Sequence, residues 1–295
     1  MITLLQLEYF RKLAASEHIT RTAKELYISQ TALSSMIISL EKELGVQLFD
    51  RSRRAIHLNE AGKVYLHYVN EIFAALDNGQ AALKDLVATQ EKNVSLAVGS
   101  SLVWLPMFHA FQKSNPGLIM QQFNLGTDNL NLALQEMTVD YVIAGEDDIS
   151  VPGLERCLIK VDGVYAVVSP DHRLAGRESI FLNELIQEPL ISLTGDSPWR
   201  GFCDRLFERA GLKANIVVEC DYTMRAPLIE SGFGIALTSS TAKQVDLLKP
   251  NKYIRIADEG ILRPMYLFWN PRKYISQAAQ HFKEYCIAYY KDSPI

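Results

Sequence analysis

The sequence of 295 residues has few features of a secreted or membrane-bound protein. It contains only four cysteines, which are scattered and form no C-x-x-C pair. Such a pattern is typical of reduced thiols in a cytosol. No window holds eighteen uncharged apolar residues, and charges interrupt the N-terminal stretch MITLLQLEYFRKL early. The sequence therefore predicts a cytoplasmic protein with no membrane span and no secretory signal.

Motifs of common enzyme classes are also missing. The sequence contains no G-x-S-x-G, no H-E-x-x-H and no G-x-x-x-x-G-K-[ST]. Its six histidines show no metal-ligand spacing, and GFGIAL (232–237) is only a fragment of a dinucleotide fingerprint. We therefore expect a protein that is not an enzyme, with no catalytic residues, no metal and no cofactor.

The charge distribution is uneven, although the net charge at pH 7 is only −4. Residues 1–60 contain eight Lys/Arg and seven Asp/Glu, whereas residues 61–295 contain twenty-two and twenty-seven. Within the first part, Arg51, Arg53 and Arg54 form a basic cluster. Such a local patch can contact DNA phosphates on a protein that is acidic overall. On charge alone, a solvated surface is the simpler explanation.

Residues 1–58 predict three short helices followed by a hairpin. Thr3 and Gln6 have capping-box spacing ahead of the first helix. Thr20 and Ser29 are the expected N-caps of the second and third helices. A four-residue connection between those two helices is typical of a helix-turn-helix. QLFDRSRRAIHL (47–58) then places a basic tip between two short apolar runs, which predicts a wing.

The third predicted helix has two contrasting faces. Apolar residues recur along it at steps of four, three and four, from Leu33 to Leu44, so this face is buried. The opposite face carries short, uncharged, hydrogen-bonding side chains, which suit base edges in a major groove. The arginines of the wing would contact phosphates. The predicted DNA-binding residues are Thr20, Arg21, Ser29, Gln30, Thr31, Ser34, Ser35, Arg51, Arg53 and Arg54.

Residues 59–90 predict one long helix that begins near Asn59. Apolar residues at heptad spacing run along it: Tyr65, Val69, Ile72, Leu76, Leu83 and Leu86. About three heptads of this kind favour pairing with the same helix of a second subunit. A long helix packed on its own domain is the alternative.

Residues 91–295 alternate between strands and helices, which predicts a doubly wound, largely parallel sheet of the α/β class. The pattern restarts near residue 163, and we expect the last strand and helix to return to the first unit. We therefore divide this region into subdomain I (91–162 plus 267–295) and subdomain II (163–266).

Hydroxyl side chains follow the predicted strands, where ligands of parallel sheets bind. The candidates for effector binding are Ser100, Ser101, Thr127, Thr194 and Thr238. Hydroxyls that precede helices suit a carboxylate or another small anion. Each of them is equally explained as a simple helix cap. Trp104, Trp199 and Tyr222 are aromatic residues for which a place in the core is the safer interpretation.

Residues 19–62, ITRTAKELYISQTALSSMIISLEKELGVQLFDRSRRAIHLNEAG, resemble the N-terminal signature of LysR-type transcriptional regulators. Weaker similarity continues through LPMFHAFQKSNPGL (105–118), SPDHRLAG (169–176) and IESGFGIAL (229–237). The resemblance implies a winged helix-turn-helix, a dimer-forming linker helix and an effector domain of the periplasmic-binding-protein type. It also implies dimers that pair into tetramers, with RNA polymerase as a further partner. Thr31 stands where the family commonly has proline, so no operator sequence is carried over.

The combined prediction is a sequence-specific DNA-binding regulator, modulated by a small-molecule effector between two subdomains. Two alternatives stay open. One is a redox-responsive LysR-type regulator that uses Cys203 and Cys220. The other is a cytosolic solute-binding module without enzymatic activity, against which only residues 1–60 and the missing signal peptide argue.

Overall fold

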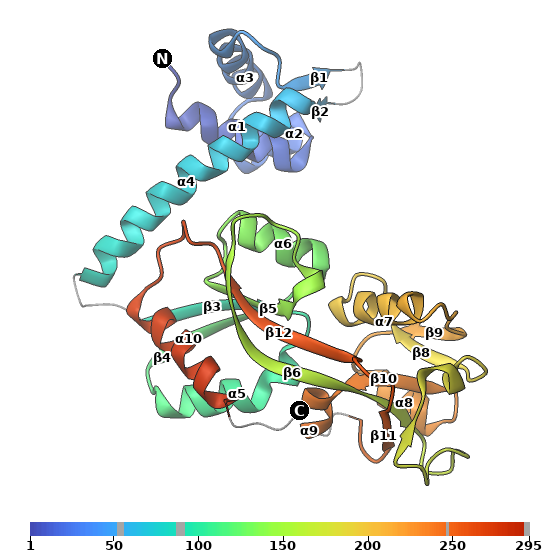
Figure 1. The fold of residues 1–295 in the computed structure, drawn as a ribbon. Coiled ribbons are helices and arrows are strands. Elements are labelled where there is room, and N and C mark those ends of the chain that lie inside the picture. The colour runs from blue at the N-terminus through green and yellow to red at the C-terminus, as the bar shows by residue number, and fades with distance from the viewer. Residues whose placement is uncertain (52–55, 87–91, 246–247, 292–295) are drawn as a thin grey trace. The chain divides into compact units, whose positions relative to one another are not determined.

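The structure is a computed structural model, which describes residues 1–51, 56–86, 92–245 and 248–291. The chain forms two compact units, Met1–Gln80 and Ala81–Ile295 (Figure 1). None of the helices in the described ranges is long and apolar enough to cross a membrane.

The first unit packs three helices, a small hairpin and the start of a long helix around one core. That core includes Phe10, Leu33 and Phe49, all fully buried. Thr3 and Gln6 form the predicted capping box. The elements are α1 (Leu4–Ser16), α2 (Ile19–Glu25), α3 (Gln30–Leu44), β1 (Phe49–Arg51), β2 (Ile56–Leu58) and α4 (Glu60–Leu86).

The N-caps of α2 and α3 differ in how well the sequence predicted them. Ser29 caps α3 as predicted, because its hydroxyl accepts the Ala32 N–H at 3.1 Å. The prediction for Thr20 was wrong. Helix α2 begins two residues earlier than that cap implies, at Ile19, because the His18 ring nitrogen Nδ1 accepts the Arg21 N–H at 3.4 Å. Thr20 therefore lies within the first turn with an exposed side chain.

Strands β1 and β2 form the predicted wing hairpin. They pair antiparallel, with Phe49 opposite Leu58 and Arg51 opposite Ile56. The predicted tip residues Arg53 and Arg54 lie outside the described residues, as does the side chain of Arg51.

Helix α4 does not use its apolar heptads as one continuous seam, so that prediction needs correction. Val69 is fully buried and Tyr65 packs beside it, both in the core of the first unit. Further along, Ile72, Leu76 and Leu83 are exposed. The early heptads thus serve the unit's own core, and the later ones present an uncovered apolar face. The side chain of Leu86 lies outside the described residues.

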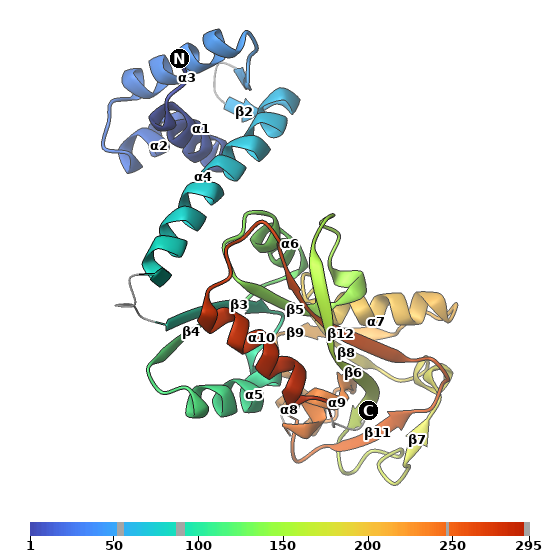
Figure 2. The ribbon, with the colours of Figure 1, turned by 60° about the vertical axis from the view of Figure 1, so that its left-hand side comes forward.

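The second unit contains two subdomains that share one mixed sheet, in the order β4-β3-β5-β12-β6-β10-β8-β9. In subdomain I, β3 is parallel to both β4 and β5. Helices α5 and α10 pack against each other on one side, where Phe111 meets Phe282 with ring centroids 5.0 Å apart (Figure 2). The elements are β3 (Lys92–Val98), α5 (Ser101–Ser114), β4 (Leu118–Asn124), α6 (Thr127–Gln135), β5 (Tyr141–Gly145), η1 (Glu146–Asp148) and α10 (Gln277–Tyr289).

Subdomain II has its own core around Trp199, Phe202 and Leu237. Strand β8 is parallel to β9 and to β10. The elements are β7 (Ser179–Ile180), η2 (Leu182–Leu185), β8 (Leu190–Leu193), α7 (Pro198–Arg209), β9 (Ile216–Cys220), α8 (Arg225–Glu230), β10 (Ile235–Ser239), α9 (Ser240–Gln244) and β11 (Lys252–Ile256).

Two long strands connect the subdomains, which corrects the expectation of a largely parallel sheet. Strands β6 (Glu155–Val168) and β12 (Leu262–Trp269) pair antiparallel with each other. The predicted boundary at 162/163 falls inside β6, where Ile159 packs in one core and Val164 in the other. The chain enters the core of subdomain I by Met265, slightly before the predicted residue 267. The sheet is mixed because the chain crosses twice, in opposite directions.

Candidate functional sites

The first candidate site is the outer face of α3. Ser29, Gln30, Thr31 and Ser35 are exposed there, and Ser34 is half-buried. The stripe on the opposite side, from Leu33 to Leu40, is fully buried, as the periodicity predicts. The helix therefore presents a polar, uncharged N-terminal end, which is the part of a recognition helix that enters a major groove.

Several predicted DNA-binding residues lie together at this end of α3. The Thr20 hydroxyl donates to Gln30 Oε1 at 3.4 Å, and the hydroxyls of Ser29 and Thr31 are 2.9 Å apart. Arg21 is also exposed, but its Nε donates to Glu25 at 2.9 Å. The hydroxyl and amide groups thus form one small cluster, whose donors and acceptors match the edges of bases.

Tyr27 is an exposed residue that the sequence interpretation missed. It lies in the turn before α3, has a positive φ of 55°, and is 96% exposed. A nearly bare aromatic ring beside the recognition helix suits a contact with DNA backbone. The sequence did contain a signal for this residue, namely an aromatic side chain within the short connection between α2 and α3.

An apolar groove of about 480 Å³ lies where α3, the wing and the start of α4 meet. Its walls include Val46, Val64 and Tyr68, which are all exposed. Together with the uncovered face of α4 at Ile72, Leu76 and Leu83, it forms a considerable exposed apolar surface. Exposed apolar patches of this kind mark protein interaction sites.

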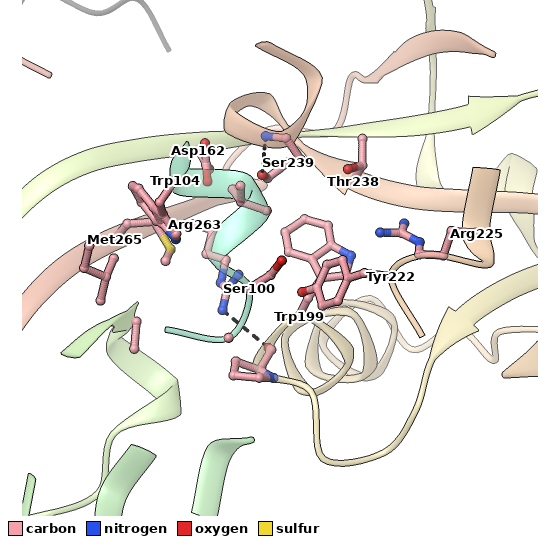
Figure 3. A pocket seen from close by; sticks show the side chains of 16 residues that line it. Ser100, Trp104, Asp162, Trp199, Tyr222, Arg225, Thr238, Ser239, Arg263 and Met265 are labelled. Atoms are coloured by element: carbon pink, nitrogen blue, oxygen red, sulfur yellow. Dashed lines mark hydrogen bonds between the residues drawn. The ribbon is translucent and has the colours of Figure 1, made fainter. Parts of the chain in front are cut away.

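The second candidate site is a cavity of about 50 Å³ between the two subdomains (Figure 3). Ser100 and Trp104 line it from α5 and its N-cap, and Thr238 lines it from β10. Trp199 and Tyr222 also line it, and both pack in the core of subdomain II, as the sequence favoured. Of the five predicted effector residues, Ser100 and Thr238 reach this cavity.

Ser101, Thr127 and Thr194 are not among the residues that line the cavity. The Ser101 N–H donates to Asn124 Oδ1 at 2.6 Å, and its hydroxyl is buried. The Thr127 N–H donates across the subdomains to the Asp196 carbonyl at 3.0 Å. Thr194 is exposed. Strand-end position alone does not decide whether a hydroxyl faces the cleft.

Charged residues that the sequence interpretation missed also line this cavity. Arg225, Arg263 and Asp162 are all buried there. The Arg225 guanidinium donates through Nη2 to the carbonyl of Leu237. Burial lowers the pKa of Arg225, and the neighbouring groups that oppose this are Tyr222 and cysteines rather than carboxylates. No periodicity marks these three residues in the sequence, because their burial depends on contacts between distant segments.

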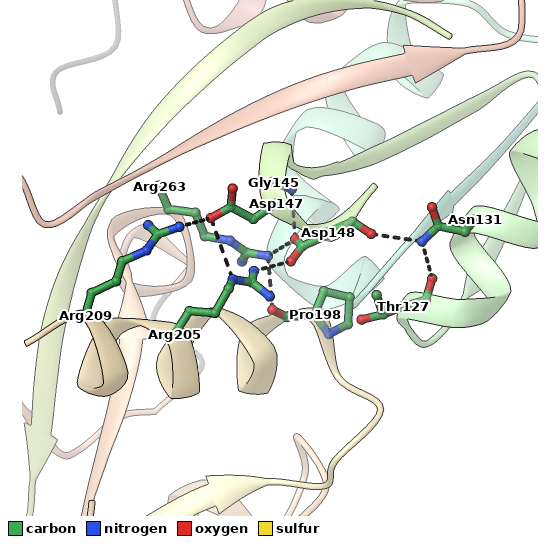
Figure 4. Close-up of polar contacts among 9 residues, drawn as sticks. All are labelled: Thr127, Asn131, Gly145, Asp147, Asp148, Pro198, Arg205, Arg209 and Arg263. Carbon is green, nitrogen blue, oxygen red and sulfur yellow. Dashed lines mark hydrogen bonds and ion pairs between the residues drawn. The ribbon is translucent and has the colours of Figure 1, made fainter. Parts of the chain in front are cut away.

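An ion-pair cluster around Asp148 connects the subdomains beside the cavity (Figure 4). The carboxylate of Asp148, in η1, pairs with Arg205 of α7 at 2.8 Å and with Arg263 of β12 at 2.6 Å. It also accepts the Gly145 N–H at 3.0 Å. Arg263 thus belongs both to the cavity lining and to the Asp148 cluster. Its guanidinium also lies 5.4 Å from the ring centroid of Trp199.

The cysteines give no support to a redox site. All four are free. Burial raises the pKa of the Cys203 thiol to about 12 and also raises the pKa of Cys220. The thiolate is the reactive form, so both thiols are held in their unreactive state at neutral pH. Within the described residues there is also no group of three His, Cys, Asp or Glu side chains that could hold a metal ion.

A winged helix-turn-helix followed by a long helix and a two-subdomain ligand-binding domain defines a ligand-responsive transcriptional regulator. Comparison with known families agrees. Residues 4–63 match the bacterial regulatory helix-turn-helix protein model of the lysR family, and residues 90–291 match the LysR substrate binding domain. The chain belongs to the LysR family of transcriptional regulators. It is a DNA-binding regulator with an effector-binding domain, and it is not an enzyme.

Relatives and solved structures resemble the chain over nearly its whole length. It is 32% identical to the HTH-type transcriptional regulator YybE of Bacillus subtilis, covering 97% of this chain and 99% of the relative. It is 26% identical to the HTH-type transcriptional regulator BenM of Acinetobacter baylyi, covering 90% of this chain and 88% of the relative. The crystal structure of CbnR, a LysR family regulator, matches with a TM-score of 0.67 and 21% sequence identity. The match covers 99% of this chain and 100% of CbnR. That structural likeness supports the fold.

Proposed function

We propose that the N-terminal end of α3 reads base edges in the major groove, while the wing contacts phosphates. The observation that carries this proposal is the exposed cluster of Thr20, Ser29, Gln30 and Thr31. Arg53 and Arg54 of the wing lie outside the described residues and enter only as sequence predictions. CbnR, a structural neighbour, has been solved in complex with its target DNA, which is consistent with this role.

The protein acts as a homo-oligomer, either a dimer or a tetramer. The exposed apolar face of α4, formed by Ile72, Leu76 and Leu83, supports pairing with the same helix of a second copy. A symmetric dimer presents two α3 helices to two DNA half-sites. RNA polymerase is a further expected partner, and the cytoplasm, where bacterial promoters are, is the expected location.

The activity of the regulator responds to a small anion or carboxylate bound between the subdomains. The hydroxyls of Ser100 and Thr238 and the guanidinium of Arg225 line the same cavity and can donate to an anionic group. The ligand changes DNA affinity only to the extent that it binds two assembly states unequally.

The proposal is tested by selecting DNA from a pool of random duplexes with the full-length protein. We expect one enriched motif with two related half-sites, and a gel shift on that motif that weakens steeply with salt. The Ser29→Ala, Gln30→Ala double variant is expected to enrich a degenerate pool. Enrichment of the same motif by wild type and double variant would show that α3 does not read the bases.

A further inference from the structure

Two buried side chains of opposite charge line the cavity without an ion-pair partner among the described residues. Arg225 is 4% exposed and Asp162 is 2% exposed. In Figure 3, they lie on opposite sides of the cavity lining. Within the described part of the chain, no carboxylate pairs with Arg225 and no Lys or Arg forms an ion pair with Asp162. Burying a charge without a counter-charge is strongly unfavourable, so both groups point to a ligand that supplies the missing charges.

Arg225 retains hydrogen-bond donors that the protein does not use. Its Nη2 donates to the Leu237 carbonyl, which is a neutral acceptor. Its Nε is buried and has no partner among the described residues. A guanidinium has five N–H donors in a planar fork that matches a carboxylate. The arginine end of the cavity is therefore suited to a carboxylate of the ligand.

Asp162 retains acceptor capacity at the other end. Its Oδ1 accepts from the Ser240 hydroxyl at 2.8 Å and from the Thr241 hydroxyl at 2.6 Å. No hydrogen bond from a described residue reaches its second oxygen, Oδ2. Lys160, two residues away on β6, interacts electrostatically with Asp162 but forms no ion pair with it within the described residues, and its Nζ donates to Gln244 at 3.0 Å. A cationic group of the ligand would donate to Oδ2 and neutralise the charge of this carboxylate.

We propose that the effector is a small α-amino acid, bound as a zwitterion with its carboxylate at Arg225 and its ammonium group at Asp162. This inference rests on the proposed effector site and specifies its ligand class. The side chain of the amino acid would lie against the apolar surfaces of Trp104, Trp199 and Met265, which also line the cavity.

Both charges are tied to one short segment of the chain. Arg225 donates to the Leu237 carbonyl in β10, and Asp162 accepts from the Ser240 hydroxyl at the start of α9, three residues further along. A ligand that carries two opposite charges close together can therefore address both ends, and the 4-aminobutyrate probe below tests a longer separation of those charges.

The size of the cavity restricts the side chain. Its volume is about 50 Å³, far below the roughly 300–1,000 Å³ of sites for drug-sized ligands. Glycine, L-alanine and L-serine are therefore the appropriate probes. Larger amino acids would require the subdomains to separate.

The test is isothermal titration calorimetry on the full-length protein with charge-matched probes. The amino-acid probes are glycine, L-alanine and L-serine. Propionate lacks the ammonium group of L-alanine, ethylamine lacks its carboxylate, and 4-aminobutyrate separates the two charges. We expect at least one of the three amino acids to bind. Its analogues should bind at least about 100-fold more weakly, because each leaves one buried charge unpaired.

Two substitutions assign the ends of the ligand. Arg225→Gln should abolish binding of the amino acid. Asp162→Asn should weaken binding of the amino acid at least about tenfold, while the weak binding of propionate should stay unchanged. Circular dichroism checks that each variant is folded. If either variant does not fold, the wild-type series with the matched probes still decides the question.

The outcomes separate this inference from the proposed function. Equal binding of propionate and L-alanine would overturn the zwitterion and leave an anionic effector in place. Tighter binding of 4-aminobutyrate would overturn the α-amino acid spacing. If none of the three amino acids binds, the inference is wrong, whereas the DNA selection described above tests the regulator independently.

Discussion

The outer face of α3 and the cavity between the subdomains bring polar groups together in opposite ways. On α3, Ser29, Gln30 and Thr31 are consecutive, exposed and uncharged. In the cavity, Asp162, Arg225 and Arg263 come from three distant segments and are buried and charged. A polar surface on a helix follows from local sequence alone. A polar cavity depends on how the whole domain folds, and each of its charges needs a counter-charge.

The largest expected effect separates buried from exposed ion pairs in the second unit. Asp148 is 1% exposed and contacts two arginines, whereas its neighbour Asp147 is 45% exposed and pairs with Arg209 at 2.7 Å. Asp148→Asn should lower the free energy of unfolding by about 3–5 kcal/mol, because Arg263 is left buried beside a neutral amide. Asp147→Asn should change it by less than about 1 kcal/mol. Urea denaturation measures both.

Equal effects of the two substitutions would mean that the Asp148 cluster does not stabilise the junction between the subdomains.

The next effect concerns the two faces of α4. Ile72→Glu places a charge on the exposed apolar face, and twofold symmetry places it there twice. We expect the dissociation constant of the dimer to rise about 100-fold or more, roughly 3 kcal/mol. Ala81→Glu is the matched control, since residue 81 is exposed on the opposite side of the helix. Analytical ultracentrifugation gives both constants.

A dimer unchanged by Ile72→Glu would assign the interface elsewhere, and the groove at Val64 and Tyr68 would be the next surface to substitute.

A smaller effect is expected on DNA recognition. Gln30→Ala should weaken binding to the selected motif by about 1–3 kcal/mol and reduce discrimination against single-base changes. Gln80→Ala, an exposed glutamine on α4, is the control and should leave both unchanged. Arg53→Ala is expected to weaken binding to all DNA sequences alike and to reduce the salt dependence of that binding. A uniform loss for Gln30→Ala would reassign that side chain to the backbone.

The sequence predicted features whose residues are close together and missed those that distant segments create. The stripe from Leu33 to Leu40, the cap at Ser29 and most strands were correct, since local periodicity and capping determine them. The seam of α4 was misjudged because periodicity does not say whether Val69 packs within its own domain or on a partner. Arg225 was missed because nothing in its own segment indicates burial.

The smallest expected effect concerns the pH dependence of the first unit. Glu17 follows α1 and connects it to the wing: its carboxylate accepts the Leu58 N–H at 2.7 Å and lies 3.0 Å from His57 Nδ1. The Leu58 hydrogen bond, followed by that of His57, holds the pKa of Glu17 below its ordinary value of 4.5. A lowered pKa means that the folded state favours the charged carboxylate. Its contribution is therefore present above the unfolded pKa and is lost as the pH falls through the folded pKa.

Glu17→Gln should accordingly lower the melting temperature slightly at pH 7 and reduce its decline below about pH 5. Glu8→Gln, a substitution within α1, is the control and should keep the wild-type profile. Thermal melts followed by circular dichroism from pH 7 to pH 3 measure both. If Glu17→Gln and wild type decline in parallel over that range, the carboxylate is not the group that ties the wing to α1, and the backbone pairing of β1 with β2 must hold it alone.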